Sequence, residues 1–248
     1  MTTSKIDDLK LKVLRNDLIA KDTYLMELQA SINVKPGMFV NIKLSNHYLR
    51  RPISISLVHD HSFEIIYKVK GQGTKDLSSI LAGDYLDVLL PLGNGYDLVE
   101  NKKVLLVGGG IGIPPLLELK KQLDTNNQVT LMCGFNSIEE HAYQDYSPLV
   151  CTIQESDQFV GNVVEYIKDL ESKKQLDYDY IYACGPMPML RALQDYIKVD
   201  GQISIEERMG CGFGACMGCT CKTKANESKR ICLDGPVFKL GEIDLYEY

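Results

Sequence analysis

Five of the eight cysteines lie close together near the end of the 248-residue chain: Cys211, Cys216, Cys219, Cys221 and Cys232. The first three follow the spacing C-x4-C-x2-C, and another cysteine comes after a longer gap. This is the plant-type arrangement for a [2Fe-2S] cluster. Structural zinc sites more often have two C-x2-C pairs, and only one is present here. The spacing therefore favours an iron–sulfur cluster bound by Cys211, Cys216, Cys219 and Cys232, with zinc as the alternative.

The residues between these ligands also follow a pattern. Cys221 comes two residues after a ligand, where an extended chain turns it to the opposite side, so we interpret it as a small buried apolar residue. We expect Gly212, Gly214 and Gly218 to take positive φ angles and bring the backbone close to the sulfurs. The basic stretch 222–230 is predicted to be a solvated hairpin turn, with a docking contact as the alternative.

A second candidate site is the turn VGGGIGIPP at residues 107–115. It follows an apolar run and precedes a helical pattern, and two prolines suit the first turn of a helix. Glycines would let the backbone approach a pyrophosphate, and the helix N-terminus offers free N–H groups. A tight turn without a ligand is the alternative, because the spacing departs from G-x-G-x-x-G. The candidate residues are Gly108, Gly109, Gly110 and Gly112.

The segment after the next apolar run bears on the choice of nucleotide. Domains that bind NAD usually carry an acidic residue there, and this chain has Asn136, Ser137 and Glu139. No arginine stands between Cys133 and Glu140 to pair with a 2′-phosphate. The sequence therefore favours NAD over NADP.

Two kinds of region must position these sites. In residues 9–100, short stretches of mixed apolar and polar residues alternate with turns, which predicts a closed or nearly closed β-barrel. One helix is expected within it, with Thr74 as its N-cap and Leu77, Ile80 and Leu81 on one face. The strands are predicted at residues 10–17, 23–30, 38–44, 62–69 and 84–90.

From Lys103 onward, apolar runs alternate with helical patterns, which predicts βαβ units and a parallel sheet. The strands are expected at 104–107, 128–133, 149–153 and 178–184, and helices at 163–170 and 187–197. The tail from Glu206 is too short to build its own core, so we expect a metal to organise it. The predicted domains are 1–100, 101–205 and 206–248.

Composition excludes several classes of protein. The net charge of -6 argues against a nucleic-acid binder. Eight cysteines are too few for a disulfide scaffold of this length. The N-terminus has no apolar core of a secretory signal, and no run of 18 apolar residues exists. We therefore expect a cytoplasmic protein without a membrane segment.

Three further motifs follow one another along the chain: RPIS at 51–54, GQGT at 71–74 and CGP at 184–186. Together they resemble the ferredoxin reductase superfamily, in which an antiparallel FAD-binding barrel precedes a Rossmann-like NAD domain. With the segments LPLGNGY, GGGIGIPPL, EERMGCGFGACMGCTC and CLDGPVF, nearly the whole chain resembles the family of electron-transfer subunits of dihydroorotate dehydrogenase B.

This resemblance implies which residues contact the cofactors. Arg51 would face the FAD pyrophosphate, since a guanidinium forks onto phosphate oxygens, and Ser54 would bind near the reactive edge of the flavin. The FAD set is Arg51, Pro52, Ile53, Ser54, Ile66, Tyr67, Lys68, Gly73 and Thr74. Cys184, Gly185 and Pro186 would lie near the nicotinamide. Ordinary strand packing is the alternative for Ile66 and Tyr67, and a buried strand-end cysteine for Cys184.

The resemblance also implies an activity. A flavin can exchange two electrons with NAD and single electrons with an iron–sulfur cluster. A partner subunit would oxidise dihydroorotate at an FMN, and electrons would pass through [2Fe-2S] and FAD to NAD+, in pyrimidine (UMP) biosynthesis. The assembly would be a heterotetramer of two subunits each, with the cysteine tail at the interface.

The chain itself shows no orotate-binding constellation, so we expect an electron relay without catalytic side chains of its own. One alternative is a related reductase subunit that serves a hydrogenase or a sulfur reductase. A non-enzymatic alternative is a zinc-stabilised binding module or redox sensor.

Overall fold

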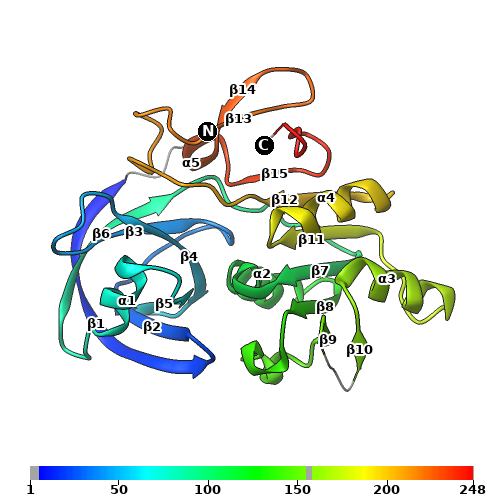
Figure 1. Ribbon diagram of the computed structural model, residues 1–248, viewed down its shortest axis with the longest axis horizontal. Helices are drawn as coiled ribbons and strands as arrows, with labels where there is room; N and C mark the ends of the chain where they lie inside the picture. Colours follow the sequence, from blue (N-terminus) through cyan, green and yellow to red (C-terminus); the bar gives the residue numbers. More distant parts are fainter. Residues whose placement is uncertain (1–5, 155–157, 248) are drawn as a thin grey trace.

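The computed structural model describes residues 6–154 and 158–247. The predicted domain limits at residues 1 and 248 lie outside the described residues. The chain forms a barrel and a sheet domain side by side, and the cysteine-rich tail lies across one end of both (Figure 1). Among the described residues, no helix is long and apolar enough to cross a membrane.

The first region is a closed barrel with strand order β1-β2-β5-β4-β3-β6, and all its pairs are antiparallel. The predicted barrel is thus confirmed. Successive residues of a strand point to opposite sides, so Ile65 and Tyr67 pack inside the barrel while Ile66 packs against the sheet domain. The strands are β1 (Asp7–Ala20), β2 (Thr23–Gln29), β3 (Phe39–Lys43), β4 (Arg51–Val58), β5 (Ser62–Lys68) and β6 (Tyr85–Leu92).

Strand β4 was not among the predicted strands. Pro52 near its start lacks a backbone donor, which weakens a strand pattern in the sequence. It lies between β3 and β5 in the barrel.

The barrel's helix differs from the prediction. Helix α1 spans Gln72–Ser78, and its N-cap is Gly71 rather than Thr74. The Thr74 hydroxyl accepts hydrogen bonds from the backbone N–H groups of Lys70 and Gly71, at 2.9 and 3.2 Å. Thr74 therefore caps the helix from within its first turn. The helix ends at Ser78. Leu77 is buried and Ile80, just beyond the helix, packs against the same barrel core, whereas Leu81 is 70% exposed.

The second region is a seven-stranded sheet with order β10-β9-β8-β7-β11-β12-β15. Six strands are parallel, as predicted, and β15 runs antiparallel to β12. The predicted strands correspond to β7 (Lys103–Gly109), β8 (Gln128–Phe135), β9 (Leu149–Thr152) and β11 (Tyr180–Cys184); the unpredicted ones are β10 (Phe159–Val160), β12 (Asp200–Ser204) and β15 (Val237–Lys239).

Helices cover both faces of this sheet. Leu105 and Val107 of β7 pack in the core under α3 (Val163–Ser172) and α4 (Met187–Tyr196). Their neighbours Val104 and Leu106 pack under α2 (Pro114–Leu123) on the other face. A strand buried on both faces reads as a continuous apolar run, which is why this part was predictable. Short 3₁₀ turns follow β7 (Gly110–Gly112) and β8 (η2, Ile138–Glu140), and η3 (Gln144–Tyr146) precedes β9.

The tail begins with the cysteine loop and continues into a hairpin of β13 (Thr220–Lys222) and β14 (Ser228–Arg230). The predicted hairpin is thus confirmed. Helix α5 (Ile231–Asp234) follows, and β15 then joins the edge of the parallel sheet. Asn94, beyond the last barrel strand, donates to the backbone oxygens of Asp234 and Val237, at 3.1 and 2.8 Å. The segment that follows the cysteine loop is therefore fixed to both regions.

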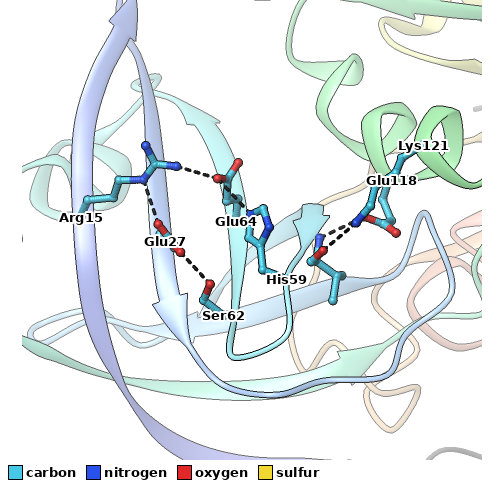
Figure 2. Close-up of polar contacts among 8 residues, drawn as sticks. Arg15, Glu27, His59, Ser62, Glu64, Glu118 and Lys121 are labelled. Carbon is cyan, nitrogen blue, oxygen red and sulfur yellow. Dashed lines mark hydrogen bonds and ion pairs between the residues drawn. The ribbon is translucent and has the colours of Figure 1, made fainter.

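The barrel and the sheet domain meet where α2 packs on β4. The buried Glu118 carboxylate accepts a hydrogen bond from the Val58 N–H at 3.0 Å, and the Lys121 ammonium donates to the Val58 oxygen at 2.8 Å (Figure 2). Beside this contact, Glu64 of β5 accepts from Arg15 at 2.6 Å. The two bonds at Val58 hold the barrel and the sheet domain in one relative orientation.

Candidate cofactor cleft and cysteine cluster

A cavity of about 220 Å³ opens between the barrel and the sheet domain. One wall comes from β4, β5 and the start of α1, and the other from the ends of β11 and β12. Residues predicted for FAD and nicotinamide meet here although they lie far apart in the sequence. Those that line the cavity are Pro52, Ile53, Ser54, Ile66, Tyr67, Lys68, Thr74 and Cys184.

Tyr67 lines the cavity only in part. Its ring stacks on Tyr24 with centroids 5.7 Å apart, and its hydroxyl donates to Asn16 Oδ1 at 2.8 Å. Burial raises the pKa of the Tyr67 phenol, so the hydroxyl stays protonated. The strand-packing alternative is thus correct for most of this side chain, whereas Ile66 faces the sheet domain.

The other predicted FAD residues, Arg51 and Gly73, lie next to each other at the start of α1. A Cβ atom on Gly73 would lie only 2.1 Å from Arg51 Nε, so the guanidinium rests directly on the glycine backbone. Arg51 also donates to the Leu49 carbonyl oxygen and to the ring of His47. The predicted RPIS and GQGT motifs are therefore in direct contact.

Several lining residues were missed in the sequence. The most informative are Ser204, the last residue of β12, and Ile205, Glu206 and Glu207, which follow it directly. The carboxyl ends of parallel strands are where such sheets bind ligands. Because β12 was not predicted, this signal was not used. The remaining unpredicted residues are Phe39, Lys70, Ile111, Met209 and Pro236.

The predicted nucleotide residues also come together. Gly108 at the end of β7 pairs with Cys184 at the end of β11. Gly112 packs so closely on this strand end that a Cβ atom would lie 2.4 Å from the Cys184 oxygen, and one on Gly109 would lie 2.7 Å from Pro186. Gly110, with φ +52°, turns the chain between them, and Gly185 follows Cys184.

Two expectations about this site need correction or refinement. The helix after the glycines does begin with Pro114 and Pro115, but neither has an N–H, and the Leu116 N–H donates to Ile113 at 2.9 Å. Helix α2 therefore offers fewer free donors than expected. Cys184 is 3% exposed, and burial and nearby Glu206 raise its pKa, so it is a neutral thiol rather than a thiolate.

An acidic residue does follow the second strand of the sheet domain. Glu140 lies in η2, directly after β8, and accepts a hydrogen bond from Lys68 at 2.6 Å. Its neighbour Glu139 pairs with Lys21 at the same distance. Glu140 was not among the candidates named from the sequence, and it joins the loop after β8 to a residue that lines the cavity.

The four predicted cluster ligands form two pairs. The Cys211 and Cys216 N–H groups each donate to the sulfur of the other residue at 3.4 Å. The sulfurs of Cys219 and Cys232 lie 3.2 Å apart. No group of three or more His, Cys, Asp or Glu side chains within the described ranges forms a single-ion site. Two thiol pairs fit two irons, each with two protein sulfurs, as in a [2Fe-2S] cluster.

Backbone donors surround these sulfurs. The Gly214 N–H donates to Cys232 at 3.1 Å, and the Cys232 N–H to Cys219 at 3.4 Å. Although burial acts in the opposite direction, hydrogen bonds from the N–H groups of Phe213 and Cys216 lower the pKa of Cys211 to about 6. Such donors stabilise anionic sulfur, which a cluster with four thiolate ligands requires. The residues therefore fit the group.

The loop's conformation agrees with part of the prediction. Gly212 and Gly214 have φ of +84° and +88°. Gly218 does not, and Met217 takes the left-handed conformation instead, with φ 57°. Cys221 is 5% exposed on β13, and burial raises its pKa to about 11. Cys221 is therefore the small buried residue that its position in the sequence predicts.

Comparison with known proteins bears on this arrangement. The model of the iron–sulfur cluster binding domain of dihydroorotate dehydrogenase B matches residues 206–244. The dihydroorotate dehydrogenase B (NAD(+)) electron transfer subunit of Fusobacterium nucleatum is 42% identical over 259 residues, covering 97% of this chain and 99% of the relative. The chain belongs to this family of electron transfer subunits. The Bacillus pumilus member is 41% identical and covers 95% and 97% of the two chains.

Two solved structures share the fold of this chain. One, described as an NADH-dependent reduced ferredoxin-NADP oxidoreductase, is 27% identical, with a TM-score of 0.86 and coverage of 100% of this chain and 92% of the other. Phthalate dioxygenase reductase shares the fold at 18% identity, with a TM-score of 0.62 and coverage of 92% and 77%. As a member of the family, the chain is an oxidoreductase subunit whose cofactors are FAD, [2Fe-2S] and NAD.

Proposed function

We propose that the chain carries electrons from a partner subunit, which oxidises dihydroorotate at an FMN, to NAD+. One observation carries this proposal: the segment after β12 connects the two sites. Residues 204–207 and Met209 line the cavity, and Cys211 begins the cluster loop two residues later. One short segment therefore joins the cavity to the cysteine loop, which supports electron exchange between the groups that the two sites would hold.

The side chains that would hold each group follow from the geometry. Cys211, Cys216, Cys219 and Cys232 would bind the cluster. The cavity residues of β4 and β5, with Arg51 and Gly73 at its edge, would bind FAD. Gly108–Gly112 with Cys184–Pro186 would bind NAD. When bound, the flavin couples hydride exchange with NAD to single-electron exchange with the cluster.

The cluster loop also supports the proposed partner contact. Cys216 is exposed, whereas Cys219 and Cys232 are buried, so one side of the cluster site faces outward. Around it lie three exposed apolar side chains: Phe213 (44%), Met217 (54%) and Leu233 (41%). A groove of about 1080 Å³ adjoins Phe213 and Leu233. Exposed apolar groups of this kind mark protein interfaces.

We propose this surface as the docking site of the catalytic subunit, in a heterotetramer of two subunits each. We also retain the division into residues 1–100, 101–205 and 206–248 as a proposal, with β15 as the strand that ties the last unit to the second. None of the eight cysteines forms a disulfide bond, as expected in the reducing cytoplasm, where we propose that the protein works.

The test is anaerobic reduction of the purified chain, alone and with its catalytic subunit. We expect the absorbance of a flavin and an iron–sulfur cluster, one FAD, and about two irons per chain. Dihydroorotate should bleach these bands only when the partner is present, and NADH should bleach them in either case. A colourless chain, or reduction by dihydroorotate without the partner, would overturn the proposal.

A further inference from the structure

Arg51 belongs to a chain of hydrogen bonds that leads away from the cofactor cavity. Its Nη2 atom donates to His47 Nδ1 at 2.8 Å, and His47 Nε2 lies 2.7 Å from Asp76 Oδ2. His47 comes from the loop before β4, and Asp76 from α1. Residues from the loop before β4, from β4 itself and from α1 thus meet at the edge of the cavity. The cofactor roles considered above involve neither His47 nor Asp76.

The direction of these bonds follows from chemistry. A guanidinium has only donors, so His47 Nδ1 must be the acceptor. A neutral imidazole that accepts at Nδ1 carries its proton on Nε2. His47 therefore donates from Nε2 to the Asp76 carboxylate. The Arg51 bond and the Asp76 bond require the same tautomer, so each supports the other.

Asp76 is well suited to this place. Its second carboxylate oxygen accepts from Gln72 Nε2 at 2.6 Å, within the same helix. The hydrogen bond from His47, together with the one from Gln72, lowers the pKa of Asp76. The carboxylate therefore stays ionised and keeps its hold on the imidazole. His47 itself is only 15% exposed, so solvent competes little for its ring nitrogens.

On its other side the guanidinium rests on Gly73, where no side chain separates the two. The Leu49 oxygen accepts one further N–H of Arg51. Within the described ranges, two of the five guanidinium donors thus have an acceptor, which leaves three for a ligand. An arginine held in this way loses less conformational freedom on binding than one in solvent, which increases affinity.

We propose that His47 and Asp76 are positioning residues: they hold the Arg51 guanidinium in place for the diphosphate of FAD. The inference rests on the proposed contact between Arg51 and that diphosphate. His47 and Asp76 touch no cofactor themselves. Their effect is to fix the Arg51 guanidinium, whose positive charge is permanent, at this edge of the cavity.

The experiment measures the rate at which FAD leaves the purified holo-complex after dilution, followed by flavin fluorescence. Because ordering one long side chain costs about 0.5–1.5 kcal/mol, His47→Leu should release FAD about 2- to 12-fold faster. His47→Asn should restore most of the retention, because its amide oxygen can accept from Arg51. His59→Leu is the matched control, since His59 also contacts a carboxylate on the barrel but lies outside this chain of bonds.

A double-variant cycle separates positioning from general stability. Arg51→Gln should itself speed release, and adding His47→Leu should then have no further effect, because the two residues act as one unit. Equal release from His47→Leu and wild type, additive effects of the two substitutions, or no effect of Arg51→Gln would each overturn the inference. The cluster spectrum should stay unchanged in every variant, so failure here is distinct from failure of the electron-transfer proposal.

Discussion

Lys68 and Glu140 join the two large regions of the molecule through an ion pair of 2.6 Å. Lys68 ends β5 and lines the cofactor cavity, and Glu140 lies in the turn after β8 of the sheet domain. Their side chains are only 23% and 14% exposed. The pair therefore connects the cavity to the loop proposed for the nucleotide, in surroundings where an unpaired charge is costly.

Breaking this pair should destabilise the chain. Lys68→Met leaves Glu140 without its cation, and we expect a loss of about 1–2 kcal/mol, between the values for exposed and buried pairs. For a chain of this size, that lowers the melting temperature of the holo-protein by roughly 2–8 °C. Lys21→Met is the control, because the Lys21–Glu139 pair is largely exposed and screened by solvent, so its loss should lower the melting temperature less. Equal melting shifts in both variants would contradict the prediction.

The contact between Gly73 and Arg51 predicts a sharp effect of one methyl group. Gly73→Ala would place a Cβ atom 2.1 Å from Arg51 Nε and must push the guanidinium away. We expect protein purified with a reduced FAD content, measured from the flavin absorbance after denaturation. Gly71→Ala is the matched control in the same motif, since its Cβ atom would meet nothing within 4 Å. Full FAD occupancy in Gly73→Ala would show that this close contact is dispensable.

A similar test applies to the cluster loop. Gly214 has φ +88°, its N–H donates to Cys232, and a Cβ atom would lie 2.6 Å from Leu233. Gly214→Ala should therefore lower the iron and sulfide content per chain. Gly241→Ala carries the same kind of backbone strain, with φ +86° and open space around it, and should keep the cluster. Equal iron content in both variants would show that the loop tolerates the change.

The exposed apolar group around Cys216 predicts where the partner binds. Phe213→Asp places a charge in the proposed interface, and loss of a central aromatic contact costs about 2 kcal/mol or more, so partner affinity should fall about 30-fold. Binding would be measured by calorimetry with the catalytic subunit. Leu18→Asp, at a 63% exposed site on β1, is the control. Unchanged affinity in Phe213→Asp would place the interface elsewhere.

Sequence reasoning succeeded where a local pattern had one physical cause. The apolar run before the glycine turn could only be a strand buried on both faces, and the cysteine spacing alone indicated a two-iron site. Sequence reasoning failed where a segment becomes a strand only because a neighbouring strand pairs with it. Strand β15 is three residues long and exists because β12 offers it a free edge. Threonine is a residue type that favours the N-cap, and the Thr74 hydroxyl does cap the helix, but from its third position.

The same limit of sequence reasoning applies to the candidate site. RPIS, GQGT and the cysteines were visible as motifs, so their residues could be named in advance. Glu206, Glu140 and His47 could not, because each matters only through a neighbour that is distant in the sequence. His47 lies beside Asp76, and Glu140 beside Lys68, only after the barrel closes and docks on the sheet domain.

The central claim is that electrons reach NAD+ through the cysteine cluster of this chain. Cys216→Ser in the complete complex tests it most directly, with Cys221→Ser as the control because Cys221 is buried and lies outside both thiol pairs. The rate of dihydroorotate-dependent NAD+ reduction would be compared with the rate of NADH oxidation by an artificial acceptor. We predict that Cys216→Ser abolishes the first rate and preserves the second. Full dihydroorotate-dependent NAD+ reduction in Cys216→Ser would contradict the account.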